Sequence, residues 1–153
     1  NRARSAGTVR LASREIGDNP RVDPAYLTDR AGSDLRVMVA GIRESRRLFA
    51  APALADWVGA ELAPGVDCRD DEELGSYVKE TATTGYHPAG TAVMGDAAAP
   101  RAVVDPALRV IGVAGLRIAD ASVFPTMVSV NIAATCMMIG HKAASLLRHD
   151  ELS

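Results

Sequence analysis

The sequence has few cysteines, and this scarcity bounds its chemistry. It contains two, Cys68 and Cys136, and the second stands in a strongly apolar run. Two distant cysteines do not make a disulfide framework of the kind that staples small secreted domains. We therefore expect two reduced thiols and a reducing compartment such as the cytoplasm.

Charge of one sign and long apolar runs are also lacking. The formal net charge is −2, from 17 basic and 19 acidic residues that are interspersed along the chain. The absence of a basic stripe argues against binding to nucleic acid or to an anionic membrane surface. No apolar run is long enough to span a bilayer, and the N-terminal residues lack the apolar core of a signal peptide. We expect a soluble protein without a membrane segment.

Motifs of several enzyme classes are absent as well. The chain contains no HExxH, no CxxC, no GxSxG and no GxGxxG. The first two absences argue against a zinc site, and the third argues against the nucleophile elbow of a serine hydrolase. Because GxGxxG is missing, the ADP half of a dinucleotide has no evident binding site in this sequence.

The chain has 153 residues, which is near the size of one domain. Its first half contains one short strand pattern and three helical patterns. Residues 7–12 alternate as in a strand, and the following segment to about residue 29 has the composition of a loop. Apolar residues at helical spacing predict three helices, and Ser33 or Asp34 can cap the first of them. The predicted ranges are 34–49, 52–62 and 71–81.

The third of these helices has a particularly specific start signal. Asp70 and Glu73 stand at the spacing of a capping box, in which each side chain satisfies an N–H group of the other end of the turn. In the second half, residues 108–111 and 116–119 are predicted as strands, and residues 132–147 as a helix that is buried at its start. The pattern of strands and helices indicates an α+β fold.

One of the three histidines stands apart from the others. His87 lies in "YHPAGTAVMG" (residues 86–95), directly before a proline and shortly before two glycines. In one interpretation the stretch is a stiff turn whose imidazole forms a hydrogen bond with the backbone. In the other it holds the imidazole as a general base, since a neutral imidazole accepts a proton near pH 7. A metal site is the weaker interpretation, because no second His or Cys stands at ligand spacing. His141 and His149 are expected to be structural or solvated.

Two other positions allow a structural and a functional interpretation. Asn131 is a good cap for the last predicted helix, and the start of a buried helix also suits an anionic or electron-rich ligand group, so the two roles can coexist. Asp120-Ala121-Ser122 is either a simple turn or a place where backbone N–H groups meet a phosphate.

Three stretches resemble, in order and spacing, the C-terminal signature of the glucose–methanol–choline (GMC) oxidoreductases. They are "YHPAGTAVMG", "AVVDPALRVIGVAGLRIADASVFPT" and "VNIAATCMMIGHKAASLL". The match resembles choline dehydrogenase-like and aryl-alcohol-type members of that family. The upstream "GTVRLAS", "PRVDPAYL" and "DLRVMVAGIRESRRLF" are similar to the family's substrate-domain segment, so nearly the whole chain is covered.

The resemblance implies an FAD-dependent enzyme that oxidises an alcohol to an aldehyde or ketone, with hydride passing to flavin N5. It implies that His87 is the catalytic base, that Asn131 is the second active-site position and that Tyr86 lines the substrate pocket. The residues that it places along FAD are Asp120, Ala121, Asn131, Ile132 and Ala133. The alternatives are a hydroxynitrile lyase-type relative, which keeps FAD without net redox chemistry, and an isolated C-terminal domain without catalytic activity.

The resemblance also implies an architecture, in which part of an antiparallel-sheet substrate domain with helices is joined by a C-terminal strand–helix unit that completes an FAD-binding domain. Residues 1–100 correspond to a substrate-domain segment that ends in the catalytic His loop, and residues 101–153 to a segment that returns to the Rossmann-like FAD-binding domain. Because GxGxxG is absent and the first residue is not Met, we expect the C-terminal portion of a larger enzyme. Its partner would be an N-terminal FAD-binding portion from the same gene or a second chain. The apolar surfaces of 116–119 and of the last helix should then be uncovered in isolation.

Overall fold

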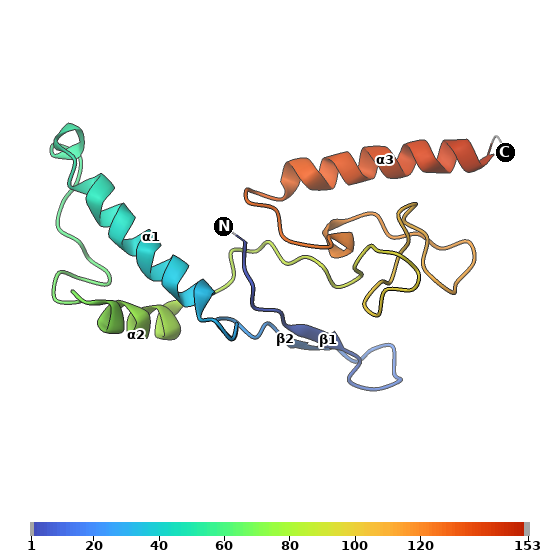
Figure 1. The fold of residues 1–153 in the computed structure, drawn as a ribbon, viewed down its shortest axis with the longest axis horizontal. Coiled ribbons are helices and arrows are strands. Elements are labelled where there is room, and N and C mark those ends of the chain that lie inside the picture. Colours follow the sequence, from blue (N-terminus) through green and yellow to red (C-terminus); the bar gives the residue numbers. More distant parts are fainter. Residues whose placement is uncertain (1, 152–153) are drawn as a thin grey trace. The chain divides into compact units, whose positions relative to one another are not determined.

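The computed structural model describes residues 2–151, which divide into two compact units (Figure 1). One unit comprises residues 3–83, and the other comprises residues 84–151 together with Arg2. Helices and one two-stranded antiparallel sheet make the fold α+β, as predicted. The predicted division near residue 100 concerns the complete enzyme and stays a prediction.

The sheet lies in the first unit and is small. Strand β1 (Thr8–Arg10) pairs antiparallel with β2 (Arg21–Asp23), with Val9 opposite Val22. β1 falls inside the predicted strand, but the prediction of loop at β2 was wrong. Gly7 precedes β1 for a steric reason, because a Cβ atom there would lie 2.1 Å from the carbonyl oxygen of Asp23.

Helix α1 (Ser33–Phe49) confirms the first predicted helix, but the predicted cap was wrong. Gly32 occupies the N-cap position with φ of 61°, and neither Ser33 nor Asp34 supplies a capping side chain. Instead, the carboxylate of Asp29 accepts hydrogen bonds from the N–H groups of Ser33 and Asp34, at 2.7 and 3.0 Å. A left-handed residue at the N-cap suits glycine, and it moves the capping task to a residue farther upstream.

The carboxylate of Asp34 holds the chain that leads into β1. It accepts the N–H of Arg4 at 2.9 Å, the N–H of Ser5 at 2.7 Å and the hydroxyl of Ser5 at 2.6 Å. Burial raises the pKa of Asp34, but the hydrogen bonds from Ser5 and Arg4 outweigh it, and the net effect lowers this pKa. The start of α1 is thereby tied to the N-terminal segment of the same unit.

The helix predicted over residues 52–62 is not formed. The 3₁₀ helix η1 (Pro52–Leu54) and one further turn replace it, and Trp57 and Leu62 are 85% and 94% exposed. Short helices depend on packing of their apolar face, and these side chains have nothing within residues 2–151 that covers them.

A network around Arg46 holds this irregular segment to α1. Its guanidinium binds the carboxylate of Glu61, with a shortest distance of 2.7 Å, and also donates to the carbonyl oxygens of Gly65 and Cys68. The hydrogen bonds from Arg46 lower the pKa of Glu61. Polar contacts therefore position a segment that was predicted to pack as an amphipathic helix.

Helix α2 (Asp71–Thr81) confirms the third predicted helix and its start signal. Both halves of the capping box between Asp70 and Glu73 are present. Leu74 and Val78 are buried on the side of α2 that packs against α1.

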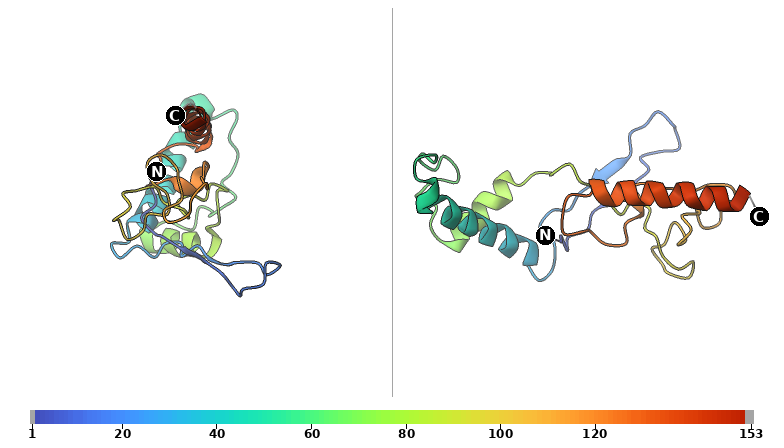
Figure 2. Two further views of the ribbon diagram at one scale, coloured as in Figure 1. Left: turned by 90° about the vertical axis from the view of Figure 1, so that its right-hand side faces the viewer. Right: turned by 90° about the horizontal axis from the view of Figure 1, so that it is seen from above.

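The second unit consists of helix α3 (Ala133–Glu151) and the loops of residues 84–132. In the left panel of Figure 2 α3 is seen nearly end-on, with these loops on one side of it. Buried residues from both parts form the core, and they are Val104, Leu108, Val123, Phe124, Ile139 and Ala143. The last predicted helix is thus present.

The strands predicted at 108–111 and 116–119 are wrong as elements, although the pairing between them exists. They form one isolated antiparallel bridge, Arg109 with Arg117, supported by the N–H of Val110 donating to the carbonyl oxygen of Leu116 at 2.9 Å. The connection between residues 111 and 116 consists of successive turns, with positive φ at Gly112 and Gly115. These turns leave too few extended residues for a strand.

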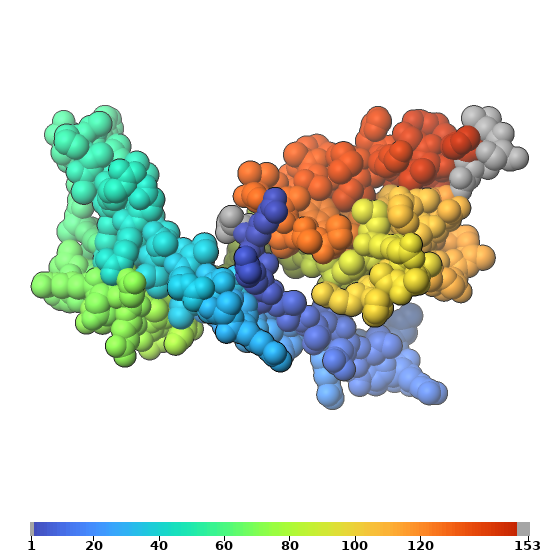
Figure 3. Space-filling model, viewed as in Figure 1, coloured from blue at the N-terminus to red at the C-terminus, as the bar shows by residue number. Residues whose placement is uncertain are grey.

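One face of α3 is uncovered. Figure 3 shows the outer side of the helix (red) free, while loops coloured yellow to orange lie against its other side. Met137 is 69% and Met138 58% exposed, and Leu116 in the loops is 50% exposed. The prediction that α3 is buried at its start was therefore wrong for this chain, whereas the predicted uncovered apolar surface is confirmed. Among the described residues, no helix is long and apolar enough to cross a bilayer.

Candidate functional site

The loop that carries His87 is fixed along a short 3₁₀ helix. The N–H groups of Gly90, Ala92 and Met94 donate to the three carbonyl oxygens of η2 (Ala121–Val123), at 3.1, 2.9 and 2.9 Å. Gly90 has φ of 78°, and a Cβ atom there would lie 3.3 Å from the carbonyl oxygen of Phe124. Glycine is therefore needed at this position for both conformation and space.

Asp120 shapes η2 from its N-cap position. Its carboxylate accepts the N–H of Ser122 at 2.8 Å, and hydrogen bonds from the side chain and backbone of Ser122 lower the pKa of Asp120. This is the turn that the sequence allowed, and Asp120 and Ala121 stand at one edge of the His87 loop. Their predicted role along the FAD pyrophosphate stays a prediction.

Asn131 joins the start of α3 to His87. Its Oδ1 atom accepts the N–H of Ala133, the first residue of α3, at 2.8 Å. The amide is therefore oriented with Nδ2 toward His87, and Nδ2 lies 3.0 Å from Nε2 of the imidazole. An amide nitrogen only donates, so Nε2 of His87 accepts and carries no proton in this arrangement.

The two side chains that sequence analysis singled out thus meet, although they stand 44 positions apart. Both are exposed to solvent in this chain, so a ligand with a hydroxyl donor can reach Nε2 and replace the amide there. Tyr86 is 82% exposed beside them and has φ of 60°. The arrangement can accept a proton at one atom and donate a hydrogen bond from an amide beside it.

The first turn of α3 adds a second feature to the site. The N–H of Ala133 is bonded to Asn131, whereas the N–H groups of Ala134 and Thr135 have no acceptor within residues 2–151. Free N–H groups and the helix dipole favour negative charge at this end. Ile132 packs partly against the core and accepts the N–H of Cys136 at 2.9 Å, which fixes the direction of the turn.

Sequence analysis missed two residues that hold this site. Thr84 accepts the N–H of Tyr86 at its Oγ1 atom at 3.0 Å, and Arg2 donates from Nε to the hydroxyl of Ser129 at 2.9 Å. The first contact lies directly before His87, and the second lies two residues before Asn131. Neither has a periodic or motif signal, because each depends on a turn geometry or on a contact across 127 positions.

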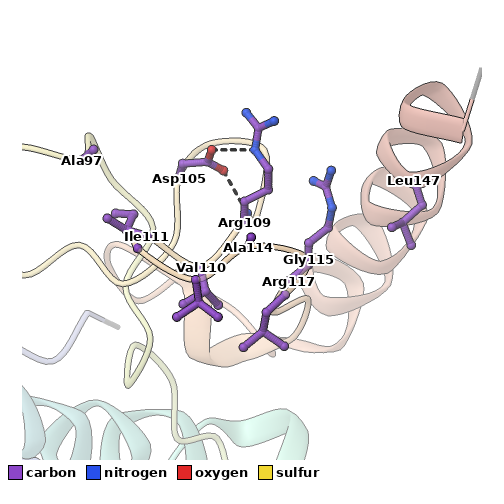
Figure 4. Close-up of a pocket in the computed structure, with 12 residues that line it drawn as sticks. Ala97, Asp105, Arg109, Val110, Ile111, Ala114, Gly115, Arg117 and Leu147 are labelled. Carbon is purple, nitrogen blue, oxygen red and sulfur yellow. Dashed lines mark hydrogen bonds and ion pairs between the residues drawn. The ribbon is translucent and has the colours of Figure 1, made fainter. Parts of the chain in front are cut away.

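A hollow in the second unit lies away from these residues. It has a volume of about 890 Å³ and is lined by the loop from Arg109 to Arg117 and by Leu147 of α3 (Figure 4). Asp105 forms an ion pair with Arg109 at its edge, with 2.9 Å between Nε and Oδ2, and the backbone N–H of Arg109 lowers the pKa of Asp105. None of the predicted site residues lines this hollow. In the part of the chain that is described, no three His, Cys, Asp or Glu side chains gather closely enough to hold a metal ion.

Comparison with known proteins decides the family. The family model described as GMC oxidoreductase matches residues 3–140 of the chain. The chain belongs to the GMC oxidoreductases. The predicted resemblance is thereby confirmed, and enzymes of this family use FAD.

Individual relatives are several times longer than the chain. Choline oxidase of Arthrobacter globiformis is 56% identical over 146 residues, which are 95% of this chain and 27% of that protein. The mitochondrial choline dehydrogenase of Homo sapiens is 41% identical over 148 residues, covering 96% of this chain and 24% of the relative. The structure of pyridoxine 4-oxidase from Mesorbium loti matches with a TM-score of 0.87 at 32% identity, over 97% of this chain and 28% of that one. The chain spans about a quarter of the length of the curated relatives that it matches.

Proposed function

We propose that this chain is the C-terminal portion of an FAD-dependent enzyme that oxidises an alcohol to an aldehyde or ketone. The observation that carries the proposal is the contact of 3.0 Å between His87 Nε2 and Asn131 Nδ2, at the open start of α3. Membership of the GMC oxidoreductases supports it. The remaining part of the enzyme, with the ADP site of FAD, would be an N-terminal portion from the same gene or a second chain, working in the cytoplasm.

In this proposal His87 is the base. Its Nε2 atom carries no proton because it accepts a hydrogen bond from the Asn131 amide, and an alcohol hydroxyl can take the place of that amide as donor. The hydroxyl proton then passes to Nε2 as the substrate loses hydride. Asn131, still oriented by Ala133, donates its N–H to the developing alkoxide oxygen and stabilises it.

The residues around this pair suit an isoalloxazine ring and its chain of phosphates. When bound, FAD supplies the hydride acceptor, flavin N5. The start of α3, with Asn131, Ile132 and Ala133, would lie at the electron-rich edge of the ring, where free N–H groups favour negative charge. Asp120 and Ala121 would lie along the pyrophosphate and ribityl chain.

The substrate that we propose to test first is choline. The two relatives described above are named for choline, and the chain is 56% identical to one of them. Tyr86 is exposed beside His87 and can contribute an aromatic wall to the pocket, which suits a cationic headgroup. Residues 1–100 would supply the substrate-domain side and residues 101–153 the FAD-domain side.

The proposal is tested by His87→Ala in the complete, FAD-loaded protein. Without the base we expect the rate of flavin reduction by choline to fall by about two to four orders of magnitude, with FAD content unchanged. Stopped-flow absorbance of the flavin under anaerobic conditions measures this rate. His141→Ala is the matched control, because its imidazole lies on α3 and takes part in neither contact of the pair.

The alternatives predict different results in the same experiment. A hydroxynitrile lyase-type enzyme would bind FAD and show no bleaching of the flavin with any alcohol. A chain without catalytic function would give a complete protein that is inactive before any substitution. Full alcohol oxidation by His87→Ala would also rule out the assigned base.

A further inference from the structure

We propose that Thr84 is a positioning residue for His87, a role that rests on the proposed function of His87 as base. Its hydroxyl oxygen accepts the backbone N–H of Tyr86 at 3.0 Å. This contact holds the residue before His87 in a conformation that it would otherwise leave.

The backbone of Tyr86 has a conformation that is unusual for an aromatic residue. Its φ of 60° lies in the left-handed region, which is sparsely populated by residues other than glycine. An aromatic side chain gains nothing from this region, so the surrounding structure must hold it there. The turn directly precedes His87 and determines the direction from which the chain enters the site.

Few other hydrogen bonds hold the segment that precedes Gly90. Downstream, the loop is pinned from Gly90 onward by its three hydrogen bonds to η2. Between Ala82 and Gly90, the hydrogen bonds of the described structure are those of Tyr86 with Thr84 and of His87 with Asn131. The compact unit that contains the site also begins at Thr84. The contact of Thr84 is therefore what fixes the chain upstream of the base.

Gly85 does not replace this anchor. A Cβ atom at Gly85 would meet nothing within 4 Å, so packing does not constrain the residue between Thr84 and Tyr86. A threonine hydroxyl that bonds the N–H group two residues ahead stabilises a turn by itself. Without that acceptor, we expect Tyr86 to relax to negative φ and the imidazole to move away from Asn131.

The experiment compares two substitutions at Thr84 in the complete, FAD-loaded protein. Thr84→Val keeps the shape and removes the acceptor, and we expect kcat for choline to fall about 10- to 100-fold, as a shift of about 1 Å does for a catalytic group. KM should change little, because the loss concerns the transition state. Thr84→Ser keeps the hydroxyl and should restore the wild-type rate. Thr83→Val is the matched control, since Thr83 makes no hydrogen bond in the described structure.

A double substitution separates positioning from a general loss of structure. Glycine adopts positive φ without support, so in a Tyr86→Gly background Thr84→Val should change kcat hardly at all. The proposal is overturned if Thr84→Val behaves as wild type, if Thr84→Ser loses as much as Thr84→Val, or if the loss persists in the Tyr86→Gly background. These outcomes differ from a failure of the proposed function, in which the unsubstituted protein shows no flavin reduction or His87→Ala keeps it.

Discussion

At the scale of single residues, the amide of Asn131 performs two tasks with its two ends. Oδ1 accepts the first N–H of α3, and Nδ2 donates to His87. The first task fixes the orientation of the second, because an amide whose oxygen is bound to the backbone can present only its NH₂ group to the imidazole. The cap of the helix thereby orients the contact between Asn131 and His87.

Substitution of Asn131 should separate these tasks. Asn131→Asp keeps an acceptor for Ala133 and removes the donor, so we expect α3 to keep its stability while flavin reduction slows by about 10²- to 10³-fold. Asn131→Ala should show the same loss of rate and also destabilise the helix start by about 1 kcal/mol. Stopped-flow reduction and thermal unfolding of the complete protein measure the two effects. Equal thermal stability of both variants would argue against the capping role.

The candidate site also shows what a sequence can and cannot predict at this scale. His87 and Asn131 were predictable because a proline, two glycines and a helix start mark their positions along the chain. Thr84 was not, because its proposed role depends on the positive φ of Tyr86, which no residue type signals at an aromatic position. A contact that stabilises a strained turn becomes visible only when backbone angles are known.

Among the helices and strands, local signals predicted correctly where an apolar face packs within the chain, and they failed where that face stays exposed. α2 follows from its capping box and from the stripe that it buries on α1. The predicted helix at 52–62 has a comparable apolar stripe, but none of the described residues covers Trp57 and Leu62. β2 was missed because Pro20 and Pro24 flank it, and prolines indicate a loop.

The start of α1 leads to a prediction about pH. Asp34 has a lowered pKa because Ser5 and Arg4 donate to its carboxylate, so it contributes stability above its pKa in the unfolded chain, about 3.9. This contribution is lost as the pH falls through the lower pKa of the folded state. At pH 6 we expect Asp34→Asn to lower the free energy of unfolding by about 1 kcal/mol, a modest value because the carboxylate is half-exposed.

The difference between Asp34→Asn and the unsubstituted chain should shrink below pH 4, because protonation then weakens the same contacts in the unsubstituted chain. Urea unfolding followed by circular dichroism at pH 6 and pH 3 measures it. Asp56→Asn is the control, since Asp56 makes no hydrogen bond in the part of the chain that is described. A difference that stays constant between the two pH values would contradict the assignment of Asp34.

For the chain as a whole, its length can be compared with the surface that it exposes. It spans about a quarter of the length of its curated relatives, and large apolar side chains are exposed in both of its units. Exposed apolar patches of this kind mark surfaces that another part of a protein covers. The free face of α3, with Met137 and Met138, adjoins the helix start that carries the proposed flavin contacts.

One substitution should therefore act in opposite directions on the chain alone and on the complete protein. Met137→Lys places a charge on a side chain that is 69% exposed in the chain alone, so it should reduce self-association there, as measured by size-exclusion chromatography. In the complete protein the same lysine would be buried without a partner, and we expect a loss of about 3 kcal/mol in stability together with weaker FAD retention. Ile139→Lys provides the contrast, because Ile139 is buried in the core of this unit and its substitution should destabilise both forms. If Met137→Lys leaves the complete protein as stable as before, this face of α3 is open to solvent in the enzyme, and the proposed flavin contacts at its start would lie at the protein surface.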